Sequence, residues 1–168
     1  MKKLLNEDLQ ELHGSLVLDT GVLVEYLIGS SKCGRIIREY FAALGRYDKI
    51  HVSIHAVSEI CYILCRARSI VTNEEEQQSR KNRSGRKFAS EKLVDLLESN
   101  ALIVHSSIDF AMKIGELKCE RSLSIVDCSA IALAESLNLP ACFVREKELE
   151  REISRKPFAV DILLLDCD

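Results

Sequence analysis

Short apolar runs alternate with longer segments of helical spacing along most of the sequence, and this alternation limits the possible folds more than any other feature. Each run is bounded by polar or turn-forming residues and has the length of a buried strand. We expect strands at residues 15–18, 50–52, 101–105, 141–144 and 160–165. We expect helices at 22–27, 33–44, 54–68 (capped by Ser53), 89–98, 107–120, 124–138 and 146–155. Short strands separated by helices predict an α/β fold, in which a mostly parallel sheet is flanked by helices on both faces.

The chain length and apolar content suit one domain. With 168 residues and 47% hydrophobic content, a single compact domain that spans residues 1–168 has a full-sized core. Leucines at helical spacing predict a short leading helix in residues 1–13. Residues 72–87 are polar and are expected to form an insertion or the extension of a helix. Their basic side chains could contact phosphates, although such a charge run is more often a solvated surface.

The sequence predicts a cytoplasmic protein without a membrane partner. Its first five residues imitate the start of a signal peptide, but Asn6, Glu7 and Asp8 interrupt the apolar segment. No apolar run approaches the ~20 residues that span a bilayer. Because the net charge is −3, any contact with nucleic acid must come from a local basic patch.

Seven cysteines lie mostly within apolar segments. An odd number outside a secretory context argues against a disulfide framework. Cys61 and Cys65 would share a helix face, but no second Cys or His pair with ligand spacing accompanies them. We therefore expect the cysteines to serve as small buried hydrophobic residues.

Acidic residues follow the predicted strands. In open parallel sheets ligands bind outside the carboxyl ends of the strands. Asp19 comes directly after the first strand, where it and Thr20 could equally cap the next helix. Glu59 lies in the helix after the second strand, where a solvated polar face is an equally good interpretation.

Asp127 is the most informative of these residues, because the segment 125–134 is otherwise almost entirely apolar. A carboxylate in a buried helix is costly unless a cation or hydrogen-bond donors compensate its charge. A structural Arg partner is the alternative to a functional site. Glu146 and Glu148 begin the helix after the strand 141–144, where the helix dipole alone could explain them.

An acidic cluster at one sheet edge, without His or Cys ligands, predicts an oxygen-only site for Mg²⁺ or Mn²⁺. Such ions orient water for attack on a phosphodiester and stabilise the leaving oxygen. The predicted chemistry is phosphodiester hydrolysis.

These residues occur in motifs that resemble those of the PIN-domain family, and within it the VapC-like toxins of prokaryotic toxin–antitoxin pairs. The matching segments span residues 15–149, and they are Leu16-Val17-Leu18-Asp19-Thr20-Gly21-Val22-Leu23, Val57-Ser58-Glu59-Ile60, Leu123-Ser124-Ile125-Val126-Asp127-Cys128 with Ile131-Ala132-Leu133-Ala134, and Phe143-Val144-Arg145-Glu146-Lys147-Glu148-Leu149. The resemblance implies a Mg²⁺- or Mn²⁺-dependent endoribonuclease with an RNA substrate, an antitoxin partner and a homodimeric state.

The resemblance also implies roles for individual residues. Asp19, Glu59 and Asp127 would be metal-site acids, and the Thr20 hydroxyl would assist them. Glu146 and Glu148 would fill the remaining acidic positions, at which the family usually has aspartates. A glutamate keeps the charge but is one methylene longer, so the metal position at this corner differs from the family pattern.

Two other functions compete with the toxin interpretation. One is an RNA-processing nuclease of ribosome maturation. The other is a PIN-like module that binds RNA or protein after its metal site has decayed, and the two glutamates in place of aspartates keep this alternative open. A nucleotide-binding fold is disfavoured because no glycine-rich phosphate loop follows a strand.

Overall fold

The computed structural model describes residues 14–28, 32–69, 91, 94–95 and 102–167. The predicted leading helix at 1–13 and the polar segment 72–87 lie outside these residues. Of the predicted helix 89–98, only residues 91, 94 and 95 are described, and all three are helical. No helix in the described part of the chain is both long and apolar enough to cross a membrane.

Five parallel strands form one sheet, which confirms the predicted α/β fold. The strands are β1 (Leu16–Leu18), β2 (Ile50–Ser53), β3 (Leu102–His105), β4 (Ala141–Val144) and β5 (Ile162–Leu165). Their order in the sheet is β3-β2-β1-β4-β5, and all four neighbouring pairs are parallel. β1 is therefore the central strand, and the chain leaves it for β2 on one side and later occupies β4 on the other. The carboxyl end of β1 lies at the topological switch point, where open α/β sheets bind their ligands.

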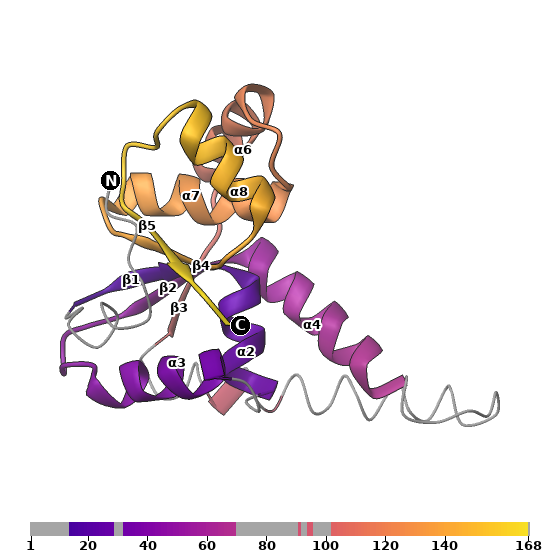
Figure 1. Cartoon of the computed structure of the whole chain (residues 1–168), viewed down its shortest axis with the longest axis vertical. Helices are drawn as coiled ribbons and strands as arrows, with labels where there is room; N and C mark the ends of the chain where they lie inside the picture. Colours follow the sequence, from indigo (N-terminus) through magenta and orange to yellow (C-terminus); the bar gives the residue numbers. More distant parts are fainter. Residues whose placement is uncertain (1–13, 29–31, 70–90, 92–93, 96–101, 168) are drawn as a thin grey trace.

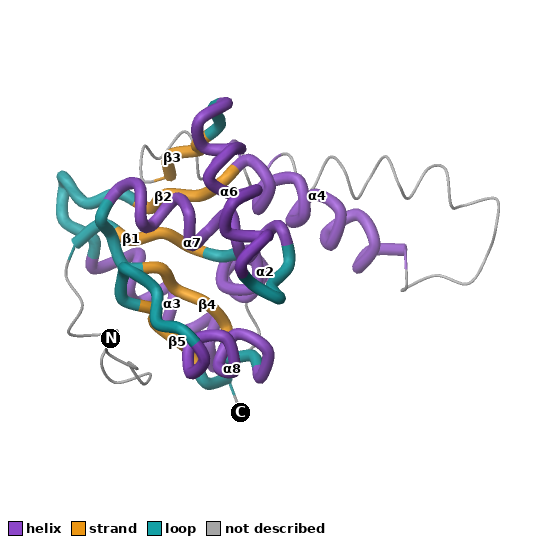
Figure 2. The backbone as a smooth tube through the Cα atoms, turned by 90° about the horizontal axis from the view of Figure 1, so that it is seen from above, coloured by secondary structure: helices purple, strands orange, loops and turns teal. Residues whose placement is uncertain are grey.

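Helices cover both faces of this sheet, as the sequence predicts (Figures 1 and 2). The described helices are α2 (Thr20–Ile28), α3 (Lys32–Ala43), α4 (Ile54–Ser69), α6 (Ile108–Glu120), α7 (Ile125–Leu137) and α8 (Lys147–Arg155). Figure 1 shows α2 and α3 on one face and α6, α7 and α8 on the other. Each face of the sheet has its own core of buried apolar residues. Leu16 and Leu18 of β1 lie in the core with α2 and α3, and Val17 lies in the core with α6, α7 and α8, because successive strand residues point to opposite faces.

Helix α7 is the most deeply buried helix, and its sequence explains why. Residues 128–134 are all buried, and alanines at 130, 132 and 134 leave room for close packing against the sheet. Ser124 caps the amino end of α7, and Asn138 ends it in the left-handed conformation with φ 53°. Both helix ends are thus fixed by local sequence.

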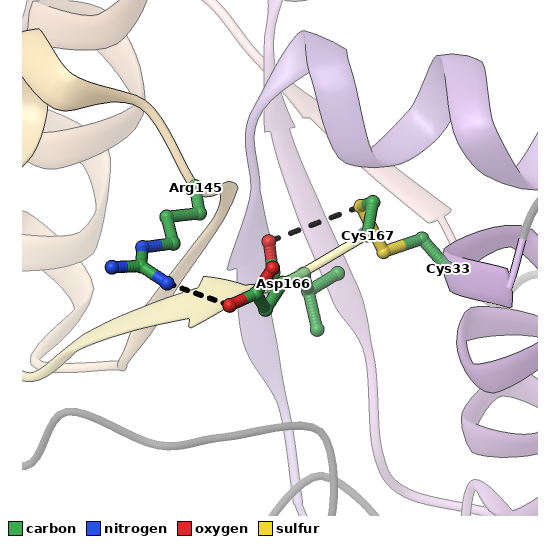
Figure 3. Close-up of a disulfide and its surroundings, with 5 residues drawn as sticks. Cys33, Arg145, Asp166 and Cys167 are labelled. Carbon is green, nitrogen blue, oxygen red and sulfur yellow. Dashed lines mark hydrogen bonds and ion pairs between the residues drawn. A yellow bond between two sulfur atoms is a disulfide. The ribbon is translucent and has the colours of Figure 1, made fainter.

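A disulfide joins Cys33, in the first turn of α3, to Cys167, two residues after β5 (Figure 3). The two residues are 134 positions apart in sequence, and their Cα atoms are 5.2 Å apart. The expectation that the cysteines serve only as buried hydrophobic residues is therefore wrong for this pair. The fold, and not the spacing of the cysteines, brings them together. Among the free cysteines, Cys128 and Cys142 are buried as expected, whereas Cys119 is exposed.

Candidate active site

Asp19 lies at the switch point of the sheet and is largely buried, with 8% of its surface exposed. Its backbone N–H donates to the Cys142 carbonyl at 3.0 Å, which ties the end of β1 to β4. Its Oδ2 accepts a hydrogen bond from the Gly21 N–H at 3.0 Å, so Asp19 also caps α2. Among the described residues its second carboxylate oxygen, Oδ1, is buried without a hydrogen-bond partner. The capping role thus accounts for only one of the two oxygens.

The environment of Asp19 disfavours its charged form. Burial, and to a smaller extent the charges of Asp127 and Glu59, raise the pKa of Asp19 to about 7. The hydrogen bond from Gly21 opposes this increase but does not cancel it. A carboxyl group with this pKa in the metal-free protein would ionise fully beside a cation, which is a common property of functional sites.

Glu146 interacts electrostatically with two of the same acids, Asp127 and Glu59. It is the N-cap residue of α8, although its side chain forms no capping hydrogen bond. Burial raises the pKa of Glu146, and the charges of Asp127, Glu148 and Glu59 raise it further. The fold therefore brings acids from the end of β1, from α4, from α7 and from the start of α8 within electrostatic reach of one another. We refer to Asp19, Glu59, Asp127 and Glu146 as the acidic cluster.

Asp127 lies in a setting that differs from the predicted one. It is half-buried in the first turn of α7, and not enclosed within an apolar helix. Its Oδ2 accepts from the Ser124 N–H at 3.0 Å, while its own N–H donates to Ser124 Oγ at 3.0 Å. This capping box, readable in the sequence as Ser124-x-x-Asp127, satisfies two N–H groups of the helix end. No Arg or Lys pairs with Asp127 within the described residues, so a structural Arg partner does not explain it.

Thr20 and Glu148 occupy contrasting positions. Thr20 is 4% exposed, and its Oγ1 is buried without a hydrogen-bond partner in the described structure. Glu148 is exposed, and it lies 3.9 Å from Arg151 on the surface of α8. Of the two, only Thr20 offers an oxygen that lacks a partner next to Asp19.

Two serines connect the helices that carry Glu59 and Asp127. Ser53, at the end of β2, accepts from the Ala56 N–H at 3.0 Å and caps α4, as the sequence predicts. Its Oγ lies 2.6 Å from Ser129 Oγ of α7, and both residues are fully buried. Sequence reasoning did not identify Ser129, because nothing in the local pattern shows that a small polar residue of α7 meets the cap of α4.

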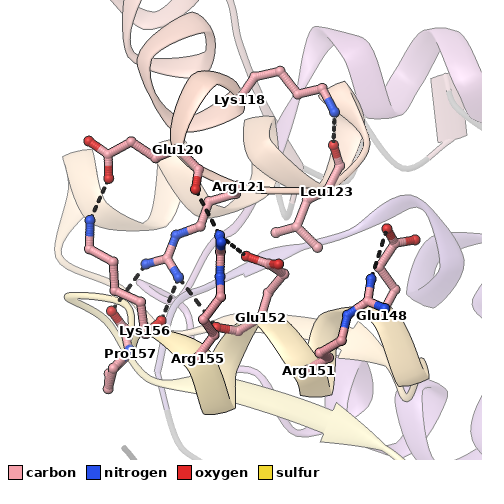
Figure 4. A network of polar contacts seen from close by, with 10 residues as sticks. All are labelled: Lys118, Glu120, Arg121, Leu123, Glu148, Arg151, Glu152, Arg155, Lys156 and Pro157. Carbon is pink, nitrogen blue, oxygen red and sulfur yellow. Dashed lines mark hydrogen bonds and ion pairs between the residues drawn. The ribbon is translucent and has the colours of Figure 1, made fainter.

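Arg121 fixes the other end of α8 (Figure 4). Its guanidinium donates to the backbone carbonyls of Glu152, Lys156 and Pro157, at 3.3, 2.6 and 3.3 Å, and it lies over the ring of Phe158. A cation at the carboxyl end of a helix satisfies the terminal carbonyls and interacts well with the helix dipole. Because Arg121 lies three residues before the cap of α7, it holds α7 and α8 in a fixed relation.

Arg145, the residue before Glu146, is held by two ion pairs. It donates to Glu150 at 3.0 Å and to Asp166 at 2.6 Å, and the second contact appears in Figure 3. Its backbone N–H donates to the Leu165 carbonyl at 2.8 Å. The segment that leads from β4 into α8 is therefore anchored to β5.

The chemistry of the donors fits a magnesium or manganese ion. The acidic cluster offers only oxygen ligands, which these hard cations prefer. The buried Asp19 Oδ1 and Thr20 Oγ1 lack partners that a cation or its water would supply. Within the described residues, however, no three His, Cys, Asp or Glu side chains are arranged closely enough to hold an ion.

Comparison with known proteins gives a family and a set of structural neighbours. The family model described as the PIN domain matches residues 16–151. No curated protein matches the sequence significantly. Among solved structures, VapC20 from Mycobacterium tuberculosis, described as a toxin that cleaves the sarcin–ricin loop, has a TM-score of 0.55 and 18% identity over 76% of this chain and 87% of its own.

Two further neighbours cover more of the chain. VapBC2 from Rickettsia felis, bound to a DNA fragment from its promoter, has a TM-score of 0.56 and 17% identity over 90% of this chain and 98% of its own. FitAcB from Neisseria gonorrhoeae has a TM-score of 0.51 and 13% identity over 88% of this chain and 96% of its own. At these identities the likeness establishes the fold alone, and the match of the PIN-domain model to residues 16–151 shows that this chain belongs to the PIN-domain family.

Proposed function

We propose that the protein is a metal-dependent endoribonuclease that hydrolyses RNA phosphodiester bonds at the acidic cluster. The observation that carries this proposal is Asp19, a buried carboxyl with one unpartnered oxygen and a pKa raised to about 7, at the switch point of a parallel sheet. A buried acid with no structural cation partner is destabilising, and such a cost is typical of a functional site.

The chain's residues have separate tasks in this proposal. Asp19 and Asp127 would hold Mg²⁺ or Mn²⁺, with Glu59 and Glu146 completing the oxygen ligands and Thr20 contributing its hydroxyl. A bound divalent ion supplies Lewis-acid stabilisation of the phosphate and activation of water. The N-cap hydrogen bond of Asp19 and the capping box of Asp127 orient these carboxylates before any substrate binds. Glu148 lies at the exposed rim, where it adds negative charge to the field at Glu146.

A toxin role with an antitoxin partner is the finer form of this proposal. Its support is the fold shared with VapC20, a toxin, and with VapBC2, which is described together with its promoter DNA. We propose that an antitoxin protein inhibits this chain and that the chain forms a homodimer. Co-expression with the product of an adjacent small gene, followed by size-exclusion chromatography with light scattering, tests both interactions.

The nuclease proposal is tested with purified protein and a panel of labelled single-stranded RNAs. We expect cleavage with millimolar Mn²⁺ or Mg²⁺ and none with EDTA. The rate of product formation should be proportional to the protein concentration, and the cleavage activity should co-elute with the protein during purification. Binding of Mn²⁺ measured by calorimetry on the same sample gives a readout that does not depend on finding the right RNA.

A degenerate PIN-like module remains the second candidate, and one observation favours it. In the described residues no three potential ligands are placed to hold an ion, and Glu146 and Glu148 stand where the family usually has aspartates. This candidate predicts RNA or protein binding without Mn²⁺ binding and without cleavage. Calorimetry with Mn²⁺ therefore separates the two functions.

A further inference from the structure

Ser53 and Ser129 form a buried hydroxyl pair between α4 and α7. Both residues have no exposed surface, and their Oγ atoms are 2.6 Å apart. The mechanism proposed above does not use this pair. A buried hydroxyl without a hydrogen-bond partner is destabilising. The strength of this contact therefore depends on which acceptor each hydroxyl donates to.

The hydrogen bonds allow one consistent arrangement of the protons. The Ser129 hydroxyl donates to the Val126 carbonyl at 2.7 Å. The Ser53 hydroxyl must then donate to Ser129 Oγ, while Ser53 Oγ accepts from the Ala56 N–H at 3.0 Å. The result is a continuous chain of three hydrogen bonds from the first turn of α4 to the first turn of α7.

This series of hydrogen bonds connects α4, which carries Glu59, to α7, which carries Asp127, near the amino end of each helix. Ser53 caps the helix that carries Glu59, six residues or about 9 Å along the axis at ~1.5 Å per residue. Val126, the last acceptor, is the residue before Asp127. Hydrogen bonds that are shielded from water are strong and directional, so these three hydrogen bonds set how α4 and α7 lie relative to each other.

Other serines of the same helices lack this property. Ser58 on α4 donates to the Ile54 carbonyl at 2.9 Å, and Ser136 on α7 donates to the Ala132 carbonyl at 2.7 Å. Each of these hydroxyl protons is used within its own helix. Only the Ser53–Ser129 contact crosses from α4 to α7 among the serine hydrogen bonds of the described residues.

We infer that Ser53 and Ser129 are positioning residues that set the separation of Glu59 and Asp127, and thereby the affinity of the acidic cluster for its divalent cation. This inference rests on the proposed nuclease function. It assigns to the pair an effect on metal binding, and not only on stability.

The test measures the Mn²⁺ concentration for half-maximal RNA cleavage, together with Mn²⁺ binding by calorimetry, in Ser53→Ala, Ser129→Ala and the double variant. Each single variant should raise the Mn²⁺ midpoint about tenfold, or about 1.4 kcal/mol, which is the scale of one buried hydrogen bond. The rate at saturating Mn²⁺ should fall far less. The double variant should resemble the singles, because either change breaks the same chain.

Ser136→Ala is the control on the same helix, since it also removes a serine hydrogen bond to a carbonyl of α7. Ser136 is exposed, and its Oγ accepts from Lys113 Nζ of α6 at 3.0 Å rather than from a residue of α4. This variant should keep the wild-type Mn²⁺ midpoint. A purely structural role for the pair predicts a lower melting temperature in Ser53→Ala and Ser129→Ala with an unchanged midpoint, and that result would overturn the inference.

Ser53→Thr keeps the hydroxyl and guards against variants that do not fold. It should retain the wild-type midpoint, and equal midpoints for Ser53→Thr and Ser53→Ala would also overturn the inference. If wild-type protein neither binds Mn²⁺ nor cleaves RNA, the proposed function itself fails. If wild type does both while the serine variants titrate like wild type, only the positioning role fails.

Discussion

At the scale of single residues, Asp127 offers the sharpest test of the acidic cluster. Asp127→Asn should reduce Mn²⁺-dependent cleavage by ~100-fold or more, because it removes a charged ligand, and each 1.36 kcal/mol of lost stabilisation is about tenfold in rate. The fold should survive. Asn retains an oxygen that can accept from the Ser124 N–H, so the main loss is the charge at the helix end, worth about 0.3–1 kcal/mol.

Asp109→Asn is the matched control for this variant. Asp109 also lies in the first turn of a capped helix, α6, but on the exposed surface. Its substitution should lower stability by a similar amount and leave cleavage unchanged. Melting curves and cleavage rates of both variants are required. An Asp127→Asn protein that cleaves like wild type would remove Asp127 from the site.

Asp19 should make the stability of the metal-free protein depend on pH. Its pKa rises from 3.8 to about 7 on folding, so the folded state binds the proton more tightly than the unfolded state does. The resulting stabilisation is complete below pH 4 and is lost as the pH rises through 7. A pKa difference of about 3 between the folded and unfolded states corresponds to about 4 kcal/mol of folding stability at most.

Urea unfolding in EDTA at pH 4.5 and pH 7.5 measures this effect. Wild type should be less stable at the higher pH, and Asp19→Asn should show a smaller difference, since Asn does not titrate. Adding Mn²⁺ at pH 7.5 should restore stability to wild type only. An identical pH dependence in both proteins would show that Asp19 does not titrate in this range.

At the scale of helices and strands, Arg121 determines how α8 ends. Arg121→Met should destabilise the protein by about 2–3 kcal/mol, because hydrogen bonds from a charged donor to buried carbonyls are lost. Arg151→Met provides the control. Arg151 is exposed and lies 3.9 Å from Glu148, and surface pairs of this kind contribute about 0–1 kcal/mol. Denaturant unfolding compares the two, and equal losses would show that the buried contacts add nothing.

The helices and strands could be predicted from sequence because their signals are local. Apolar runs of strand length set β1 to β5, and capping residues such as Ser53, Ser107 and Ser124 mark where α4, α6 and α7 begin. The parallel orientation of the strands, although not their order in the sheet, followed from the alternation of strands and helices. These features need only the neighbouring residues to be read.

Features that depend on two distant segments could not be predicted in the same way. Neither the Ser53–Ser129 contact nor the Cys33–Cys167 bridge has a local signature, because each depends on how the elements pack. The capping box of Asp127 was readable as Ser124-x-x-Asp127, but the apolar residues that follow it suggested a fully buried charge instead. Whether the acids bind metal is set by tertiary geometry and remains a prediction.

At the scale of the whole molecule, the disulfide should contribute strongly to stability. It joins two residues that are 134 positions apart in the sequence. A cross-link of this length restricts the unfolded chain and is worth about 5 kcal/mol in the loop-entropy model, or about 2–5 kcal/mol as typically measured. Reductant should therefore lower the melting temperature of wild type. Cys167→Ser should melt at the lower temperature with or without reductant, and an unchanged wild-type melting curve would show that the bridge adds no stability.

The same bridge has a consequence for the order of assembly. The covalent ring from Cys33 to Cys167 contains β2 and β4, yet β1, the strand that lies between them, is outside the ring. During synthesis β1 is made before Cys167, so the central strand is available before the ring can close. An oxidised chain that refolds from denaturant has lost this order, and β1 must enter a sheet whose neighbouring strands are already linked. We expect refolding of the oxidised protein to be slower at the step in which β1 is inserted than refolding of the reduced protein, as measured by stopped-flow fluorescence of the tyrosines.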